Sequence, residues 1–218
     1  MKKQFVVIGL GNFGGSLVKE FHEAGTEVLA IDQSLERVEK YRPFATHCVQ
    51  VSNMSETTLT QLGIRNMDHA FVALGDDVES SVLTTLILKE MGIKQVWVKA
   101  ADTYHKRVLE KIGADRVIHP ERDMAKRIAH HVISEKMIDY IELSDKHGIV
   151  ELAASEKVHQ QSLIDLNVRA KFGCTIIGIQ RKGDTIVSPS AEERIYKGDT
   201  LIVIGTNEDI YRFEEEGL

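Results

Sequence analysis

The sequence opens with a glycine motif that strongly limits what the chain can fold into. Residues 5–8 form a short apolar run that indicates a buried strand, and G-x-G-x-x-G follows at once at positions 9–14. A helix is expected at residues 16–24 and a second strand at 28–31, with Asp32 at its end. A strand, a glycine turn, a helix and an acid about twenty residues further on predict a dinucleotide-binding βαβ unit.

Each glycine and the acid have a distinct physical role in such a unit. Gly9 permits the tight turn, Gly11 lets the backbone approach a phosphate, and Gly14 lets the helix pack close to the strand. The helix N-terminus presents free N–H groups and the positive end of its dipole to that phosphate. Asp32 can accept hydrogen bonds from a ribose diol, and its charge repels a 2′-phosphate, which disfavours NADP. The motif therefore predicts a bound adenine nucleotide.

Strand and helix patterns continue to alternate as far as residue 120. Short apolar runs separated by helical patterns predict a doubly wound, Rossmann-like parallel sheet. The strands are expected at residues 5–8, 28–31, 47–51, 70–74, 96–98 and 116–118, in the spatial order 3-2-1-4-5-6. Ligands on such a sheet lie beyond the carboxyl ends of the strands, where the strand order reverses.

This crevice predicts which residues hold the nucleotide. They follow the ends of the first four strands and are Gly9, Gly11, Asn12, Phe13, Gly14, Asp32, Gln33, Asn53, Met54, Ala73, Leu74 and Gly75. Asn53 and Met54 would flank the adenine ring, one polar and one apolar. A simple core position for Met54 is an equally good interpretation of the sequence.

A long helix and a small α+β lobe are expected after residue 120. Pro120 suits the first turn of a helix, and apolar positions recur at helical spacing from Glu121 to about Ile138. These positions form an apolar stripe along the helix, which favours a connector or a contact with another subunit. The alternative is that the stripe packs on the chain's own sheet. Strands at 148–153, 174–180, 185–187 and 201–205 and a helix at 208–215 follow. The predicted domains are a nucleotide-binding domain at 1–120, a connector helix at 121–141 and a C-terminal domain at 142–218.

Composition argues against several classes of protein. The net charge of −6 and the lack of a basic cluster argue against a nucleic-acid surface. No apolar run approaches the ~18 residues of a membrane span, and the N-terminus lacks a signal-peptide pattern. Cys48 and Cys174 lie in apolar, strand-like runs, which suits small buried side chains in a reducing cytosol better than a disulfide. The chain is expected to be cytoplasmic.

The sequence offers little catalytic chemistry. A dehydrogenase needs a second domain that presents a substrate and a proton-transfer group to the nicotinamide. The small lobe has only His147 and His159, both in polar, loop-like settings. There is no nucleophile elbow, no H-E-x-x-H and no P-loop lysine motif. No residue is therefore predicted to be catalytic. A ligand-binding regulator is therefore favoured over an enzyme. A small NAD-dependent oxidoreductase and an NADH-sensing regulator remain the alternatives.

Several longer runs together resemble one known family. They are VIGLGNFGG at 7–15, LGIRN at 62–66, VKA at 98–100, KIGAD at 111–115, HPERDM at 119–124 and LNVRAKFG at 166–173. With Asp32, they make the whole chain similar to the cytosolic RCK (also called KTN) regulatory subunits of bacterial Ktr potassium-uptake systems, the KtrA/KtrC group.

The resemblance implies a regulatory ring. Such subunits form dimers that assemble into a homo-octamer beneath a dimeric membrane potassium-translocating subunit of the KtrB/KtrD type. ATP and ADP compete for the crevice, to which Lys99 also belongs. A cation (Mg, Ca or Na) lies near the phosphates and is held by the acid at Glu121. Cyclic di-AMP binds between two C-terminal lobes at the positions of Ile164, Asp165, Leu166, Arg169, Ala170, Thr175, Ile176 and Pro189.

One position departs from the family pattern. The family usually has arginine where this chain has Asn12, and that arginine reaches a terminal phosphate from the neighbouring subunit. Asparagine is shorter and uncharged, so it cannot make a charge-assisted contact of that kind. Binding of ATP or ADP is expected to survive, because the glycine-loop amides and Asp32 remain. We expect Asn12 to weaken the ability of the chain to discriminate between ATP and ADP.

Overall fold

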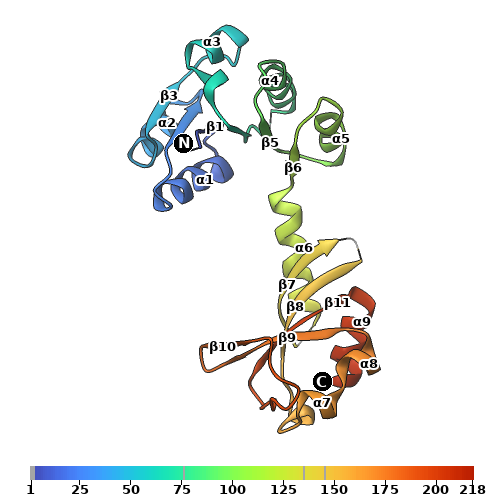
Figure 1. Cartoon of the computed structure of the whole chain (residues 1–218). Helices are drawn as coiled ribbons and strands as arrows, with labels where there is room; N and C mark the ends of the chain where they lie inside the picture. Colours follow the sequence, from blue (N-terminus) through green and yellow to red (C-terminus); the bar gives the residue numbers. More distant parts are fainter. Residues whose placement is uncertain (1–2, 76, 135, 145) are drawn as a thin grey trace. The chain divides into compact units, whose positions relative to one another are not determined.

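The computed structural model describes residues 3–75, 77–134, 136–144 and 146–218. Two compact units divide the chain, Met1–Glu121 and Arg122–Leu218. The first, blue to green in Figure 1, contains a six-stranded parallel sheet. Its strand order is β3-β2-β1-β4-β5-β6, so the predicted order is confirmed. Its strands are β1 (Phe5–Ile8), β2 (Val28–Asp32), β3 (His47–Gln50), β4 (His69–Val72), β5 (Gln95–Lys99) and β6 (Arg116–Ile118).

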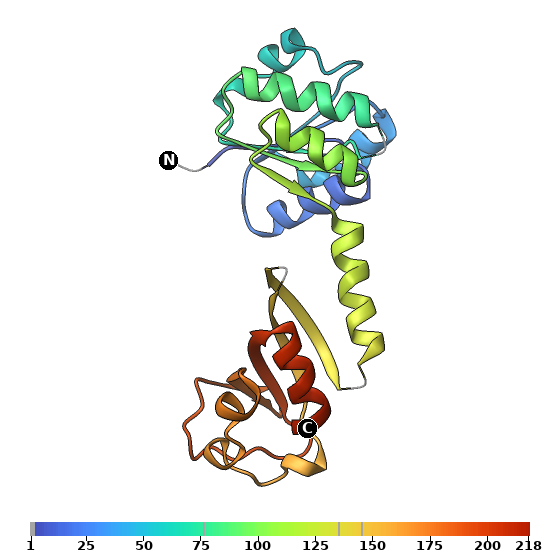
Figure 2. The same cartoon turned by 90° about the vertical axis from the view of Figure 1, so that its right-hand side faces the viewer.

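Helices connect these strands on both faces of the sheet. The pair α4 and α5 lie side by side, as Figures 1 and 2 both show. The helices are α1 (Asn12–Glu23), α2 (Leu35–Tyr41), α3 (Glu56–Gln61), α4 (Val78–Glu90) and α5 (Thr103–Lys111), with short 3-10 turns at Arg42–Phe44 and Ile64–Asn66. Helix α1 begins four residues before its predicted start. Its first turns contain Gly14 and Gly15, residues that disfavour a helix when only the sequence is read.

Two cores form on opposite faces of this sheet because neighbouring side chains of a strand point in opposite directions. On β1, Val6 and Ile8 pack in one cluster with Leu88 of α4 and Leu109 of α5. Val7 joins the other cluster, which includes residues of α1 and α2. All five residues of β2 are buried. Burial on both faces explains why the central strands β1 and β2 are nearly continuous apolar runs.

Trp97 of β5 anchors an aromatic group on the second of these faces. Its ring meets that of Phe71 edge-on, with centroids 5.6 Å apart. The guanidinium of Arg116 lies 4.7 Å from the centre of the same ring, within the range of a cation–π contact. Residues 95, 97 and 99 alternate along β5, so Trp97 shares its face of the strand with Lys99.

The second unit contains a five-stranded antiparallel sheet in the order β10-β9-β11-β8-β7. Its core includes Leu152, Ile179, Leu201 and Phe213, all fully buried. The strands are β7 (Met137–Ser144), β8 (His147–Ala153), β9 (Thr175–Arg181), β10 (Asp184–Val187) and β11 (Thr200–Thr206). The helices are α7 (Leu163–Leu166), α8 (Val168–Phe172) and α9 (Asn207–Arg212), with short turns at Glu156–Val158 and Phe213–Gly217.

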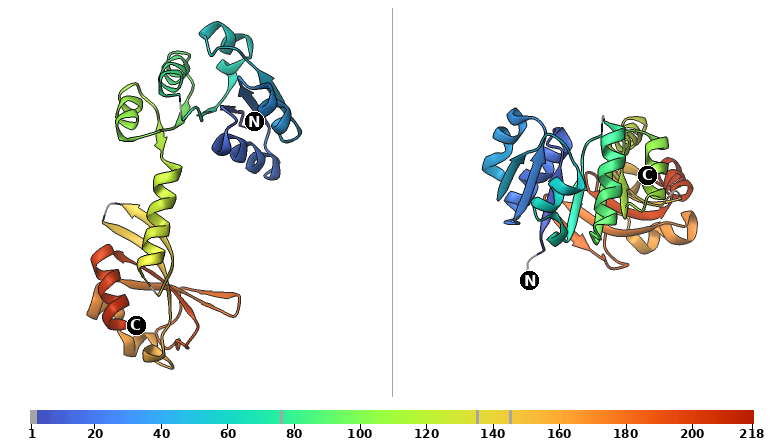
Figure 3. Two further views of the ribbon diagram at one scale, coloured as in Figure 1. Left: turned by 180° about the vertical axis from the view of Figure 1, so that it is seen from behind. Right: turned by 90° about the horizontal axis from the view of Figure 1, so that it is seen from above.

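The connector prediction was wrong at its C-terminal end. Helix α6 spans Pro120–Ile133 only, and β7 occupies Met137–Ser144, so residues 121–141 are not one helix. Figures 1 and 3 show α6 running alongside β7, where Arg127 pairs with Asp139 at 2.8 Å. Register shifts interrupt β7 in two places, which breaks the period of two expected of a strand. The remaining spacing of apolar residues therefore imitated a helix.

The apolar stripe of α6 is largely open to solvent in this chain. Met124, Ile128, Val132 and Ile133 are each at least 50% exposed. Within this chain, these four described side chains are therefore not part of a buried core. A contact with another subunit stays a prediction.

His105, at the start of α5, is a buried titratable group. It is 2% exposed, and its Nδ1 accepts a hydrogen bond from the backbone N–H of Ala101 at 3.1 Å. Burial lowers the pKa of His105, and the neighbouring His119 acts in the same direction. A histidine whose pKa is lower in the folded state stabilises the fold above the unfolded pKa of about 6.5, and this stability is lost as the pH falls below that value.

We therefore expect acid to destabilise the protein partly through His105. His105→Asn keeps an acceptor for Ala101 but removes the titration, so the stability of the variant should fall less between pH 7 and pH 5.5. Urea unfolding at a series of pH values measures this difference. His69, whose pKa is also lowered by burial, contributes equally in both proteins. Identical pH dependence of the two unfolding free energies would show that His105 has no such role.

Candidate functional site

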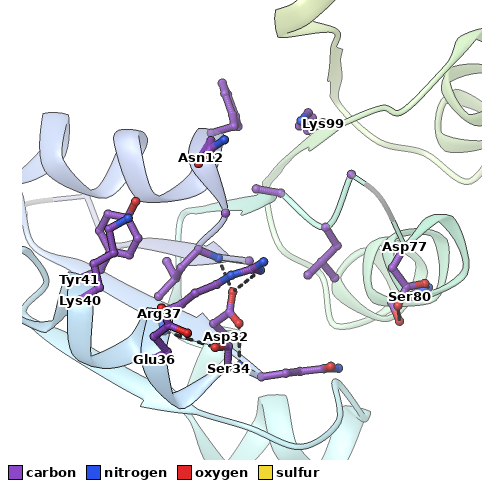
Figure 4. Close-up of a pocket in the computed structure, with 18 of the residues that line it drawn as sticks. Asn12, Asp32, Ser34, Glu36, Arg37, Lys40, Tyr41, Asp77, Ser80 and Lys99 are labelled. Carbon is purple, nitrogen blue, oxygen red and sulfur yellow. Dashed lines mark hydrogen bonds and ion pairs between the residues drawn. The ribbon is translucent and has the colours of Figure 1, made fainter.

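A cavity of about 670 Å³ opens at the carboxyl ends of β1, β2, β4 and β5. It occupies the place that strand order predicts for a ligand, beside the reversal between β1 and β4. Eleven predicted residues line it: Gly9, Gly11, Asn12, Phe13, Asp32, Gln33, Ala73, Leu74, Gly75, Lys99 and Glu121. Figure 4 shows the labelled side chains arranged around this space.

The glycine loop leaves backbone bare at the cavity wall. Gly9 has φ +94°, and a Cβ there would lie 2.7 Å from the carbonyl oxygen of Ala73. A Cβ on Gly14 would lie only 1.9 Å from the carbonyl oxygen of Gly9, so α1 can begin this close to the loop only with glycine. A Cβ on Gly11 would meet nothing within 4 Å, because it would project into open space. The loop is therefore a cradle that a larger residue would fill.

Asp32 joins the end of β2 to this loop. Its Oδ2 accepts a hydrogen bond from the backbone N–H of Leu10 at 2.6 Å, and its Oδ1 accepts one from Ser34 at 2.7 Å. Arg37 approaches the same carboxylate at 3.6 Å (Figure 4). The residue is only 4% exposed. A carboxylate has about four acceptor sites, so Asp32 retains capacity to accept from a ribose hydroxyl beyond these two backbone bonds.

The opposite wall carries a second charge pair. Lys99 Nζ lies 2.5 Å from Oε1 of Glu121, and this lysine holds the pKa of Glu121 below its ordinary value. At the start of α4, Asp77 accepts hydrogen bonds from the backbone N–H and the hydroxyl of Ser80. These bonds lower the pKa of Asp77.

Three of the predicted nucleotide residues do not line the cavity. Gly14 lies behind the loop, in the first turns of α1. Asn53 is engaged locally, since its Oδ1 accepts hydrogen bonds from the backbone N–H of Ser55 and the hydroxyl of Thr58, both at 3.2 Å. Met54 packs partly buried against the core, which was the alternative interpretation of that residue. Flanking of an adenine by Asn53 and Met54 thus stays a prediction.

The residues predicted to bind cyclic di-AMP lie on neighbouring segments of the second unit. The backbone N–H of Ile164 in α7 donates to Ala191, and that of Ser188 donates to Ile177 in β9, so α7 and β9 both adjoin the 188–191 loop. Ile164 is 63% exposed, whereas Leu166 is buried. The other predicted residues are exposed or partly exposed: Asp165, Arg169, Ala170, Thr175, Ile176 and Pro189.

Two features are absent from the described part of the chain. No described helix is both long and apolar enough to cross a bilayer. No three histidine, cysteine, aspartate or glutamate side chains among the described residues are grouped so that they could hold a metal ion.

Comparisons with known proteins agree with the two-unit fold. The TrkA-N domain family matches residues 5–120, and the TrkA-C domain family matches residues 148–216. The Ktr system potassium uptake protein A of Bacillus subtilis is 52% identical over 99% of this chain and 97% of its own length. Protein C of the same organism is 50% identical over 100% of this chain and 99% of its own length. The chain belongs to the Ktr potassium uptake protein A/C family.

The fold of this Ktr family member also recurs in a larger channel. The GsuK channel bound to NAD is 20% identical, with a TM-score of 0.53, over 99% of this chain and 38% of the channel chain. At that identity the likeness concerns the fold alone. It agrees with a Rossmann-like unit followed by a small antiparallel unit, the RCK arrangement predicted from the sequence.

Sequence reasoning missed one wall of the cavity in this Ktr family member. Helix α2 contributes Arg37, Lys40 and Tyr41, which recur at i, i+3 and i+4 and so share one helix face. That spacing, directly after Asp32, was an available signal. The other lining residues not predicted are Ser34, Glu36, Asp77 and Ser80, whereas Leu10 lies within the predicted glycine loop.

We expect Asp32→Ala to weaken every ribose-containing nucleotide. The change removes both the acceptor for the ribose and the acceptor that holds the Leu10 amide. Since hydrogen bonds to a charged group contribute about 1.5–3 kcal/mol, affinity should fall about ten- to a hundredfold. Calorimetric titration with ADP measures the effect, with Asp68→Ala as a control because Asp68 also accepts a backbone N–H but lies outside the cavity. Unchanged affinity in the Asp32 variant would remove this residue from the site.

Proposed function

We propose that the chain is a nucleotide-responsive regulatory subunit of a Ktr-type potassium transporter, and not an enzyme. The observation that carries the proposal is the cavity where bare glycine-loop backbone faces Asp32, in a chain similar throughout to Ktr proteins A and C. The loop and the N-terminus of α1 suit phosphates, and Asp32 suits a ribose. ATP and ADP are the proposed competing ligands.

The cation proposed at the phosphates would contact Glu121. Its side chain is 71% exposed at the rim of the cavity, so a partner ligand or a second subunit can reach it. Carboxylate and phosphate oxygens are the ligands that Mg²⁺ and Ca²⁺ prefer. Among the described residues, Glu121 is the carboxylate that contacts Lys99, and a cation bound to it would take its remaining ligands from the phosphates or from another subunit.

Assembly into an octameric ring is the proposed way in which nucleotide binding reaches the transporter. Leu83 and Leu86 of α4, Tyr104 and Val108 of α5 and the α6 stripe are large apolar side chains left exposed. Exposed apolar side chains on neighbouring helices, such as those of α4 and α5, are typical of subunit contacts. The ring would act in the cytoplasm, at the inner face of the membrane, through a potassium-translocating partner.

Cyclic di-AMP is the proposed ligand of the second unit. Arg169 is exposed on α8 and could pair with a phosphate, while exposed Ile164 offers an apolar contact to adenine. Sharing of the ligand between two chains would suit this open surface.

Thermal unfolding with different ligands tests the proposed function. A ligand at a hundred times its Kd adds about 2.7 kcal/mol to stability, so binding appears as a raised Tm. ATP and ADP should each raise the Tm, and cyclic di-AMP should add a further increase in the presence of either. Stabilisation by NADH alone, without a response to ATP or ADP, would instead support an NADH-sensing regulator. NADH turnover with added substrates would favour the oxidoreductase alternative.

Asn12→Arg should sharpen the preference for ATP over ADP. Asn12 is exposed on the first turn of α1, and the family resemblance implies that an arginine at this position reaches the terminal phosphate of a nucleotide on the neighbouring subunit. We expect the ratio of ATP to ADP affinity to rise about tenfold, as for one added charge-assisted hydrogen bond. Calorimetry with both nucleotides measures the ratio, and Asn12→Gln controls for side-chain length. Equal ratios in the natural and arginine proteins would contradict the expectation.

A further inference from the structure

Lys99 is held in a fixed path along the cavity wall. It is the last residue of β5, and its side chain is 17% exposed. Gly75 supports it closely, because a Cβ on that glycine would lie 3.1–3.3 Å from Cε, Cδ and Nζ of the lysine. The stem therefore passes over the loop that follows β4, and the ammonium group reaches the cavity.

Glu121 is the partner of this ammonium group, and it is far less constrained. The carboxylate lies 2.5 Å from Lys99 Nζ, yet the glutamate side chain is 71% exposed. Glu121 is the second residue of α6. The pair therefore ties the end of β5 to the first turn of the helix that leaves the nucleotide-binding unit.

Three described residues with a lysine or arginine side chain line the cavity, and of these Lys99 lies on the wall opposite α2. The other two, Arg37 and Lys40, belong to α2, where Arg37 approaches Asp32 and Lys40 lies over the Tyr41 ring. Figure 4 shows Lys99 across the space from Arg37. Asn12, which also lines the cavity, carries no charge.

The path of a bound nucleotide leads to this lysine. With its ribose at Asp32, the phosphates follow Gly11 along the loop. The glycine loop lies against Ala73, since a Cβ on Gly9 would meet the carbonyl oxygen of that residue. The segment that begins at Ala73 continues to Gly75, against which Lys99 packs. A terminal phosphate is thus brought toward the wall that bears the lysine.

We propose that Lys99 exchanges partners, between the carboxylate of Glu121 and the terminal phosphate of a bound nucleotide. The inference rests on the proposed nucleotide function. Each additional phosphate charge competes more strongly for the one ammonium group. Binding then loosens the tie to α6 and frees Glu121 to bind a cation. A nucleotide with more phosphate charge favours the arrangement in which Lys99 contacts the phosphate over the one in which it contacts Glu121. The exchange therefore converts nucleotide charge into a change at the start of α6.

A double-mutant cycle tests the exchange in the full-length chain, stripped of nucleotide and kept in EDTA. The variants are Lys99→Met, which retains the packed stem, Glu121→Gln, and the two combined. Glu121→Gln should strengthen ATP binding about three- to tenfold, because the competing carboxylate charge is gone. In the Lys99→Met background the same change should have no effect. Lys99→Met alone should weaken ATP about tenfold, ADP less, and AMP not at all.

The matched control is Lys40→Met, which removes the same charge from the α2 wall and should not produce this graded pattern. Equal effects of Glu121→Gln in both backgrounds would overturn the exchange, as would unchanged ATP affinity in Lys99→Met. If the methionine variant does not melt cooperatively, Lys99→Gln replaces it in the cycle. Failure of the natural chain to bind any adenosine nucleotide would end the proposed function and the exchange together. If the chain binds ATP but the effects of Lys99→Met and Glu121→Gln are additive, the partner exchange is refuted and the proposed function stands.

Discussion

The hydrogen bond between Asp32 and the amide of Leu10 is the contact on which the site depends. It spans 22 residues of sequence and joins the end of β2 to the turn after β1. The acceptor is charged and buried, a combination that costs free energy unless its hydrogen bonds are made. The same carboxylate thus holds the glycine loop in place and keeps capacity to accept a hydrogen bond from a ligand. Ligand recognition and loop architecture cannot be separated at this residue.

Local sequence patterns predicted the first unit well because its central strands, such as β1 and β2, are buried on both faces. Apolar runs such as residues 5–8 between helical patterns leave few other topologies, and connection rules then specify the strand order. The second unit was harder to predict. The bulged β7 lost its period of two, so its residues were assigned to the preceding helix. Tertiary pairing with β8, which no local pattern records, decides its structure.

The residues of the candidate site also differ in how well the sequence predicts them. Residues of the motif, such as Gly11 and Asp32, were predicted because their spacing follows from the geometry of one βαβ unit. The α2 residues Arg37 and Lys40 were missed, since their approach to the cavity depends on how that helix packs. Asn53 was placed by strand order alone, whereas its short side chain is retained by the local turn before α3. Position along a strand therefore predicted proximity, but not the direction of a side chain.

Trp97 gives this protein a native optical probe. It is the single tryptophan of the chain, and its partly exposed indole contacts the Phe71 ring and the Arg116 guanidinium. It stands two residues from Lys99 on the same face of β5. Indole emission depends on nearby charge, so the fluorescence of the unlabelled protein originates beside the end of the strand that carries Lys99. Spectroscopy on this chain can follow that region without a dye, a tag or an added chromophore.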